Sequence, residues 1–347
     1  MIRHLLLLLA LLTSATARAE APIPIRVVVV TAFEIGNDTG DAAGEFQAWA
    51  EAYPTKLAFP AGERDLRVDP ATGVLVLSTG IGTARATASV MALGSDPRFD
   101  LSHAYWLVAA IAGVNPHEAS LGSAAWIGTL VDTDYGYEID SREIPAGWST
   151  GRVPLDRNTP FAQPLPDTSG NLFVLDAGLR DWAYALTKSV KLADTPVLRT
   201  IRARYSAYPK ATTPPAVVTG DEATGQTFWH GKLLNDWAEQ WTRYWTGGSG
   251  RFVMTGMEDT GVARALATLG RTGKADPRRL MVLRTGSNYT LPAPGVTAAQ
   301  SLSAENGGLT GLTASLAAAY GVGRPVVDEL TRHWPRYVDH IPGAAKP

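Results

Sequence analysis

Residues 25–31 of this 347-residue chain read Ile25-Arg26-Val27-Val28-Val29-Val30-Thr31. A β-branched run of this kind is typical of a strand that is buried on both faces, as in a parallel sheet. Six similar runs follow, at residues 73–78, 105–112, 124–131, 216–219, 252–255 and 280–285. Helix-like stretches lie between several of them, at residues 83–93, 231–245 and 259–269. This alternation of strands and helices predicts an α/β domain with three layers.

The composition excludes several classes of protein. Hydrophobic residues make up 45% of the chain and charged residues 18%, which excludes a largely disordered or fibrous protein. The formal net charge is −2, so there is no basic surplus to attract nucleic acid, and we expect no such partner. The chain has no cysteine, which excludes thiolate metal sites and a cysteine nucleophile. Four scattered histidines also lack the spacing of metal ligands, so we expect no metal: His103, His117, His333 and His340.

The N-terminus has the pattern of a secretory signal. Arg3 and His4 precede an apolar run at residues 5–12, and a small polar stretch then ends in Ala17-Arg18-Ala19. The run is well short of the ~20 residues that a membrane span needs, so we expect cleavage after residue 19 and no membrane span thereafter. The mature protein is expected to be exported, which in a Gram-negative cell means the periplasm.

The segment from about residue 141 to residue 215 differs from its flanks because it is rich in proline. It contains a plausible helix at residues 178–191 and is interpreted as an insertion over the main sheet. We expect residues 20–347 to form a single domain with this insertion.

Glycines and polar residues follow the expected strands, at the sheet edge where the ligands of α/β proteins bind. A carboxylate at the start of a helix can accept two sugar hydroxyls, while an arginine and an asparagine at the next strand end can orient a nucleophile and bond a heterocycle. The candidates at these strand ends are Glu34, with Asp38 as its alternative, Thr79, Gly80, Ala112, Gly113, Met257, Glu258, Arg284, Asn288 and Tyr289.

Taken in order, these turns resemble those of the nucleoside phosphorylase and nucleosidase superfamily. The resemblance is carried by residues 78–82, 111–116, 218–221, 256–258 and 283–288. Within it, residues 31–34, 227–231, 256–261 and 284–289 look like the purine nucleoside permease family. The resemblance implies a phosphorylase-like mixed sheet, a purine nucleoside ligand and a part in nucleoside uptake. It also implies cleavage of the N-glycosidic bond, and relatives of this kind form homo-oligomers.

The same resemblance assigns roles to the candidate residues. Glu258 would hold the ribose hydroxyls above Met257, and Glu34 would activate the attacking water. Arg284 would orient that carboxylate or the nucleophile. The other implied contacts are a phosphate or water loop at Thr79 and Gly80, a base-side loop at Ala112 and Gly113, and rings against the purine at Phe228 and Tyr289.

Asn288 stands where many relatives carry an aspartate that protonates the leaving base. An amide cannot act as a general acid, so Asn288 could only stabilise the base through hydrogen bonds. The loop at residues 78–82 has no arginine to bind a phosphate, which favours hydrolysis over phosphorolysis. Phosphorolysis would require phosphate as a co-substrate, and we expect no other cofactor. The alternatives are a non-catalytic protein that delivers nucleosides to a separate transporter and a scaffold with a vestigial pocket.

Trp237, Trp241 and Trp245 recur every four residues and therefore share one face of the expected helix. A base-stacking platform is one interpretation of this face. We favour a buried face or a subunit contact, because aromatic stripes at helical spacing usually pack in a core.

Overall fold

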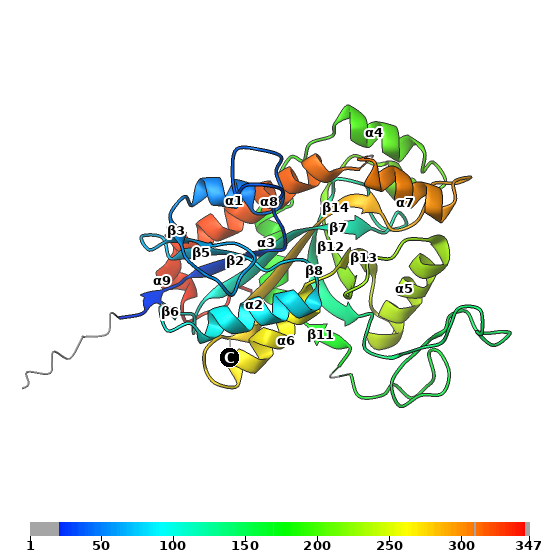
Figure 1. The fold of residues 1–347 in the computed structure, drawn as a ribbon, viewed down its shortest axis with the longest axis horizontal. Helices are drawn as coiled ribbons and strands as arrows, with labels where there is room; N and C mark the ends of the chain where they lie inside the picture. The colour runs from blue at the N-terminus through cyan, green and yellow to red at the C-terminus, as the bar shows by residue number, and fades with distance from the viewer. Residues whose placement is uncertain (1–20, 169, 309, 344–347) are drawn as a thin grey trace, which may run out of the picture.

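The computed structural model describes residues 21–168, 170–308 and 310–343. The expected signal segment, residues 1–19, lies outside this part of the chain. A ten-stranded mixed sheet occupies the centre of the molecule (Figure 1). Its main path runs through β11 (Leu172–Val174), β8 (Ala124–Asp132), β12 (Val217–Thr224), β13 (Phe252–Gly256), β7 (Tyr105–Val114), β2 (Val27–Thr31), β5 (Val74–Ser78), β4 (Leu66–Asp69) and β3 (Lys56–Leu57).

The tenth strand, β14 (Leu280–Tyr289), closes part of this sheet into a ring. It pairs in parallel with β7 and antiparallel with β8, so β8, β12, β13, β7 and β14 form a continuous circuit of pairings. On the open side of the sheet, β7, β2 and β5 run parallel. The predicted α/β fold with a mixed sheet is therefore confirmed.

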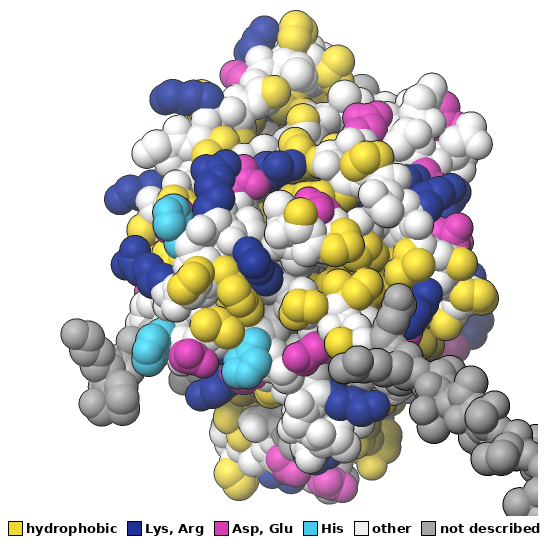
Figure 2. All heavy atoms as spheres, turned by 90° about the vertical axis from the view of Figure 1, so that its left-hand side faces the viewer, with side chains coloured by type: hydrophobic (Ala, Val, Ile, Leu, Met, Phe, Trp, Pro, Cys, Tyr) yellow, Lys and Arg dark blue, Asp and Glu magenta, His cyan; other side chains and the backbone are white. Residues whose placement is uncertain are grey.

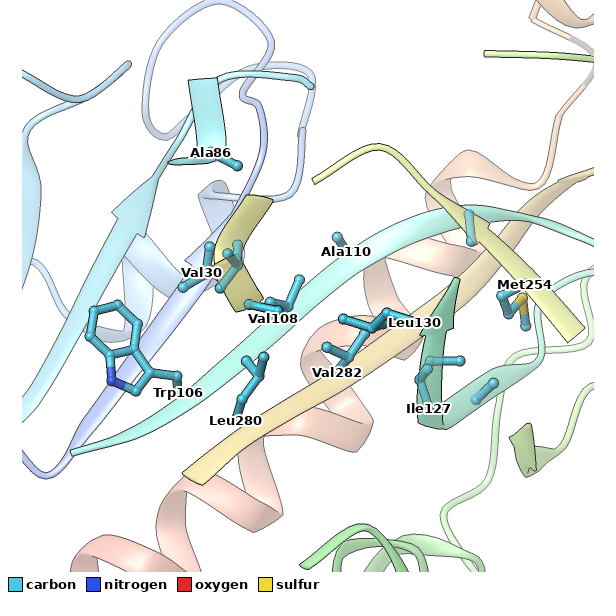
Figure 3. Close-up of a cluster of buried hydrophobic side chains, with 14 of the residues drawn as sticks. Val30, Ala86, Trp106, Val108, Ala110, Ile127, Leu130, Met254, Leu280 and Val282 are labelled. Carbon is cyan, nitrogen blue, oxygen red and sulfur yellow. The ribbon is translucent and has the colours of Figure 1, made fainter. Parts of the chain in front are cut away.

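The alternation of side chains along β2 explains why both faces of the sheet are covered. Val28 and Val30 point into one hydrophobic cluster, while Val27 and Val29 point into another, because successive side chains of a strand face opposite sides. The first cluster, in which Val30, Val108 and Val282 lie on neighbouring strands, is shown in Figure 3.

Helices cover the two faces of the sheet as separate layers. The helices α2 (Thr83–Ser95) and α6 (Asp259–Gly270) pack together over the first cluster. The second cluster receives side chains from α1 (Gln47–Ala52), α3 (Ala177–Thr187), α8 (Leu312–Arg332) and α9 (Trp334–Tyr337). The result is the three-layer arrangement that the sequence predicts.

The tryptophans of α5 (Lys232–Trp245) form a third cluster. Trp237, Trp241 and Trp245 are buried and pack with Phe252 of β13. The interpretation as a buried helix face is therefore confirmed.

The proline-rich segment contains both irregular chain and parts of the layered core. A short hairpin of β9 (Tyr137–Glu138) and β10 (Arg152–Val153) leads into irregular chain. β11 then pairs with β8, and α3 packs against β8 and α8. The remaining elements are α4 (Pro196–Ala203), α7 (Ala298–Asn306), the short turns η1 (Pro209–Thr212) and η2 (Pro277–Arg279), and a pair formed by β1 (Ile23–Pro24) and β6 (Phe99–Asp100).

β14 is longer than the predicted run at residues 280–285. It continues to Tyr289, with a shift in register against β7 between Gly286 and Asn288. Such an irregularity changes the direction of the side chains that follow it. Asn288 is therefore part of a strand that is locally distorted, instead of lying in a loop after the strand.

The face on the left-hand side of Figure 1 carries a mixed surface. Basic and acidic side chains are interspersed on it, with apolar side chains between them (Figure 2). Neighbouring charges of opposite sign produce little long-range field. On the part of this face that the structure describes, there is no continuous basic stripe.

Candidate functional site

A pocket opens near the carboxyl ends of β2, β5, β7, β13 and β14. Seven of the predicted site residues line it: Ala112, Gly113, Phe228, Met257, Glu258, Arg284 and Asn288. The remaining lining residues are Ala32, Phe33, Glu45, Ile81, Ile111, Thr255, Gly256 and Ser287. The structure thus brings together residues that lie more than half the chain apart in the sequence.

Arg284 lies at the floor of this pocket, and its side chain is only 2% exposed. One terminal nitrogen, Nη1, donates to the Ile111 carbonyl at 2.8 Å, and the other donates to Glu258 Oε2 at 2.8 Å and to Asp259. Burial alone would lower the pKa of Arg284, but the surrounding carboxylates, Asp259 foremost, raise it above its ordinary range. Arg284 is therefore a fixed cation that organises the acids around it.

Glu258 is held from two sides at the first residue before α6. Its Oε1 accepts the Gly82 N–H at 3.0 Å, and its Oε2 accepts the Arg284 guanidinium and the Met257 N–H. A carboxylate has about four acceptor positions, so Oε1 keeps capacity for further hydrogen bonds. The carboxylate faces the pocket in a fixed orientation, as a group that binds a diol must.

Glu45 is a second carboxylate in the pocket, just before α1. Its two oxygens accept the Ala32 N–H at 2.6 Å and the Ile111 N–H at 2.8 Å. Burial, and then the charge of Glu258, raise the pKa of Glu45 to about 8. A carboxyl group with such a pKa can exchange a proton near neutral pH.

Glu222 of β12 lies behind Arg284 and is completely buried. Its Oε1 is 3.7 Å from Arg284 Nε, and neither of its oxygens meets an N–H donor among the described residues. Burial, and then the neighbouring Asp259, raise the pKa of Glu222 well above its ordinary value. Burial and the neighbouring Asp259 thus favour the neutral form of Glu222, which would limit the negative charge around Arg284.

The carboxyl groups of Glu222 and Asp259 pack directly against Gly256. A Cβ atom at position 256 would overlap Glu222 Oε1 and would lie 2.5 Å from Asp259 Oδ2. We therefore expect Gly256→Ala to lower the free energy of unfolding by about 1–3 kcal/mol, the range for an overpacked core. Urea denaturation followed by circular dichroism measures this difference.

Gly321→Ala is the matched control for that substitution. Gly321 lies within α8, and a Cβ atom there would meet no other atom within 4 Å in the described part of the chain. Alanine is favoured over glycine inside a helix, so the control should gain up to about 1 kcal/mol. Equal unfolding midpoints for the two variants would contradict the tight fit at Gly256.

Asn288 lies over the main chain of Gly113 at the other end of the pocket. A Cβ atom on Gly113 would come 3.4 Å from Asn288 Nδ2. The amide oxygen accepts the Ser287 hydroxyl at 3.0 Å, and Nδ2 donates to the Tyr289 carbonyl at 3.3 Å. These contacts hold the amide of Asn288 in one orientation beside the main chain of Gly113.

The prediction for Glu34 requires a correction. Its carboxylate accepts the N–H groups of Ile35, Gly44 and Gln47, and it does not line the pocket. Glu34 thus closes the loop that leads to α1, and this loop carries Glu45 into the pocket. Asp38, the alternative, is paired with Lys56, Arg64 and Arg67 and also lies outside the pocket lining.

Three other predicted residues also lie beside the pocket lining. The hydroxyl of Thr79 donates to the Gly80 carbonyl at 2.9 Å, and Ile81 is the residue of this loop that reaches the pocket. Tyr289 is buried and donates its hydroxyl to the Ala211 carbonyl at 2.8 Å. Thr79 and Gly80 therefore lie beside this pocket lining and Tyr289 lines a neighbouring cavity, so their contact with a ligand stays a prediction.

Glu45, Glu222 and Asp259 were not predicted as site residues from the sequence. A polar, glycine-rich loop separates Glu45 from the end of the first strand. Because only residues directly after a strand were considered, the sequence did not point to Glu45 as a pocket residue. Glu222 lies inside a strand that is longer than predicted. Asp259 directly follows Glu258. A second acid next to a predicted site residue could have indicated that Asp259 belongs to the site.

Comparison with known proteins identifies the family. The family model described as purine nucleoside permease matches residues 24–342. The chain is 30% identical over 266 residues to a probable purine nucleoside permease of Schizosaccharomyces pombe, covering 74% of this chain and 76% of that protein. The chain belongs to the purine nucleoside permease family. A purine nucleoside permease of Candida albicans is 28% identical over 262 residues, which span 64% of its length.

Solved structures of similar fold include a nucleosidase and a hydrolase. A 5'-methylthioadenosine/S-adenosylhomocysteine nucleosidase of Neisseria meningitidis, in complex with methylthio-immucillin-A, aligns with 88% of this chain and 99% of its own. The TM-score is 0.52 and the identity 15%. A futalosine hydrolase of Helicobacter pylori aligns with a TM-score of 0.53 and 13% identity, covering 88% of this chain and 98% of its own. Because the identities are this low, the similarity shows only that this permease family member shares its fold with these proteins.

The family name refers to nucleoside uptake. Within the residues that the structure describes, none of the helices combines the length and the apolarity needed to cross a bilayer.

Proposed function

We propose that this chain binds a purine nucleoside in the pocket around Glu258 and hydrolyses its N-glycosidic bond. The observation that carries the proposal is the arrangement of Glu258, Glu45 and Arg284 in one pocket, with Asn288 at its other end. This arrangement supplies a diol acceptor, a proton acceptor and a hydrogen-bonding amide for the base.

The pocket has separate polar groups for the sugar and for the base. Glu258 would accept the 2′- and 3′-hydroxyls on its free acceptor positions, with Met257 against the sugar ring. Asn288, Gly113 and Phe228 would surround the purine. Because Asn288 cannot donate a proton as an acid, it would stabilise the leaving base through hydrogen bonds.

The electrostatics of the pocket support water as the nucleophile. Glu45 and Glu258 face the pocket. Among the residues that the structure describes, Arg284 is the only cation in its lining, and it is already bonded to Glu258 and Asp259. The Gly82 N–H, at the start of α2, is taken by Glu258 as well. A phosphate dianion would therefore meet the Glu258 carboxylate and no free cationic donor, which disfavours its binding, whereas a neutral water needs no such donor.

Glu45 is our candidate for the base that takes a proton from the attacking water. In the reaction the C1′–N9 bond breaks, the water oxygen bonds to C1′, and the released proton passes to Glu45. The departing purine takes a proton from solvent, and Glu45 then releases its proton to solvent, so the overall reaction yields free base and ribose. Nearby carboxylates also stabilise the positive charge that develops on the sugar in glycoside cleavage.

The proposed setting is outside the cytoplasm. If the N-terminal segment acts as an export signal, the protein would meet nucleosides before they enter the cell. Cleaving or capturing them there fits a role in nucleoside uptake, the process for which the family is named. Fractionation of cells that express the full chain, with N-terminal sequencing of the mature protein, tests this location.

Incubation with nucleosides tests the reaction. Adenosine, guanosine and inosine are supplied with and without phosphate, and released base, ribose and ribose 1-phosphate are measured. We expect base and ribose to appear at the same rate with and without phosphate. Release that requires phosphate would replace hydrolysis with phosphorolysis, and no release would remove the enzymatic part of the proposal.

Binding without turnover is the second candidate, and the amide at Asn288 is the observation that favours it. Without an acid at this position, the departure of the base lacks one ordinary source of catalysis. Calorimetry distinguishes the candidates: nucleoside binding without product, lost in Glu258→Ala, would indicate a delivery protein.

Phe228 is 47% exposed at the rim of the pocket, an unusual place for a large apolar ring. If it stacks on the base, Phe228→Ala should weaken nucleoside binding by about 1–3 kcal/mol, which is roughly 5- to 150-fold in Kd. Tyr137→Ala, a substitution of another exposed ring in β9, is the control and should leave Kd unchanged. Equal Kd values for wild type and Phe228→Ala, measured by calorimetry, would remove Phe228 from the site.

A further inference from the structure

A second cavity adjoins the nucleoside pocket and shares two residues with it. Ser287 and Asn288 line both spaces. The other walls of the second cavity come mainly from α7 and from the end of α4, which lie together beyond β14 (Figure 1). A ligand that contacts Asn288 in the first pocket therefore has further space past that residue, lined by both polar and apolar side chains.

His230 and Glu305 form a polar pair beside this second cavity. Glu305 lines the cavity from α7, and its Oε1 is 3.8 Å from His230 Nδ1. The His230 side chain is 2% exposed and that of Glu305 is 13% exposed. Among the described residues, neither ring nitrogen of His230 has a well-formed hydrogen bond. Buried imidazole nitrogens normally have partners, so this pair has unused hydrogen-bonding capacity.

The loop that carries His230 also carries Phe228 into the first pocket. One short segment thus presents a ring where we place the face of the purine, and an imidazole near the second cavity. The spacing of 3.8 Å between Nδ1 and Oε1 is wider than a hydrogen bond, but it suits two groups that face neighbouring atoms of one ligand.

Three other titratable residues line the second cavity together with Glu305. Arg204 and Tyr205 come from the end of α4, and Tyr289 comes from β14. Both phenols are engaged, since Tyr205 donates to the Leu291 carbonyl at 2.9 Å and Tyr289 donates to that of Ala211. Arg204 is exposed at the rim. His230 is therefore the titratable group that directly faces Glu305.

Burial moves both members of the pair toward their neutral forms. It raises the pKa of Glu305 to about 7 and lowers the pKa of His230, against a smaller opposing effect of the Tyr289 main chain. Near neutral pH the imidazole is neutral, with one donor and one acceptor nitrogen, while the carboxyl group changes between donor and acceptor.

We propose that His230 and Glu305 bind positions 1 and 6 of the purine and make the preference between 6-oxo- and 6-aminopurine nucleosides depend on pH. The inference rests on the proposed function, because it requires the base to lie against Asn288. Positions 1 and 6 are adjacent ring atoms, so two protein groups side by side can bond both. No covalent step is involved.

The direction of the effect follows from donors and acceptors. An ionised Glu305 accepts the N1–H of a 6-oxopurine, and the imidazole N–H donates to its oxygen. A protonated Glu305 donates to the bare N1 of a 6-aminopurine, and the imidazole acceptor takes the amino hydrogen. Inosine should therefore be favoured above about pH 7 and adenosine below it.

Calorimetric titration with inosine and adenosine tests the inference at about pH 6 and about pH 8, on either side of the Glu305 pKa of about 7. The ratio of their affinities should shift toward inosine by at least about tenfold at the higher pH, because a mismatched buried hydrogen-bonding group is costly. Taking the ratio cancels the titration of Glu45, which acts on the sugar side of both ligands.

Two variants complete the test. In Glu305→Gln the amide offers both a donor and an acceptor, so both nucleosides should bind with a ratio that no longer changes with pH. Glu329→Gln is the matched control, because Glu329 forms another carboxylate–imidazole pair, with His333 at 3.1 Å, outside both cavities. It should keep the wild-type shift.

The outcomes separate this inference from the proposed function. If both nucleosides bind to the wild type with a ratio that is constant with pH, this inference fails while the proposed function stands. A shift that persists in Glu305→Gln also overturns it. If neither nucleoside binds at either pH, the proposed function fails and this inference fails with it. If Glu305→Gln does not fold, two measurements test the inference in its place. The ratio of inosine to adenosine affinity in the wild type should change with pH, and His230→Phe should lower both affinities.

Discussion

Glu45→Gln should abolish nucleoside hydrolysis almost completely. The amide cannot take a proton from the attacking water, and a positioned general base contributes typically 10²–10⁴-fold to rate. In the wild type the pKa of Glu45 is raised to about 8 by burial and by Glu258, and the base must be ionised to act. The wild-type rate should therefore rise about tenfold per pH unit up to about pH 8 and then level off. Initial rates of base release across this range measure both effects.

The same substitution should change how stability depends on pH. The ordinary pKa of a glutamate is 4.5, so between that value and about 8 the folded protein holds a proton that the unfolded chain has released. The free energy of unfolding of the wild type then falls by about 1.4 kcal/mol per pH unit in this window from Glu45 alone. Glu45→Gln lacks this contribution, so it should gain about 4 kcal/mol relative to wild type between about pH 5 and about pH 8.

The pH slope is a better measure for Glu45→Gln than stability at one pH. Both oxygens of Glu45 accept main-chain N–H groups, and the amide nitrogen of glutamine would face one of them. This adds a cost of about 1–3 kcal/mol at every pH. Glu329→Gln, which changes a carboxylate paired with His333 outside the pocket, is the comparison for the rate. Equal rates for Glu45→Gln and wild type would remove Glu45 as the base, and equal slopes would show that its pKa is not raised.

Arg284→Met should be the most destabilising single change in the pocket. It would leave Glu258 and Asp259 buried without the cation to which both are bonded. Removing one partner of a buried ion pair typically costs about 3–5 kcal/mol. We expect the variant to lose nucleoside binding and to unfold at much lower urea concentration, with loss of activity following from both.

Arg284→Lys separates the charge of Arg284 from its shape. Lysine keeps the positive charge but lacks the planar fork that reaches the Ile111 carbonyl and two carboxylates together. This variant should fold, with kcat reduced and KM raised because Glu258 is no longer held in place. Arg142→Ala, at a fully exposed ion pair with Asp140, should leave stability and activity unchanged. Normal activity in Arg284→Met would contradict the organising role of Arg284.

The first strand of the main sheet was predicted correctly from the sequence. The run at residues 25–31 predicts a doubly buried strand, and β2 occupies Val27–Thr31 with all its side chains buried. The reason is local: the β-branched residues from Val27 to Thr31 leave no polar face to expose, so the strand is stable when both of its faces are covered. The tryptophan stripe of α5 was predictable for the same kind of reason, because its spacing follows the helical period.

Loop length limited the prediction of Glu45. The segment between β2 and α1 is polar and glycine-rich, and sequence alone does not tell how far such a segment travels before it returns. The structure shows Glu34 spanning this loop with three main-chain hydrogen bonds, which leaves Glu45 to enter the pocket. Proximity to the end of β2 therefore predicted the correct edge of the sheet for the pocket, but it favoured Glu34 where the structure has Glu45 in the pocket lining.

The sequence by itself determined the layered α/β fold, the family and the two strand ends that carry Glu258 and Asn288, because these depend on periodicity and on short motifs within a few residues. Only the tertiary structure decided that four carboxyl groups, those of Glu45, Glu222, Glu258 and Asp259, surround one guanidinium. The physical reason is that burial and mutual charge set the protonation of these groups, and both depend on distances between strands far apart in the chain.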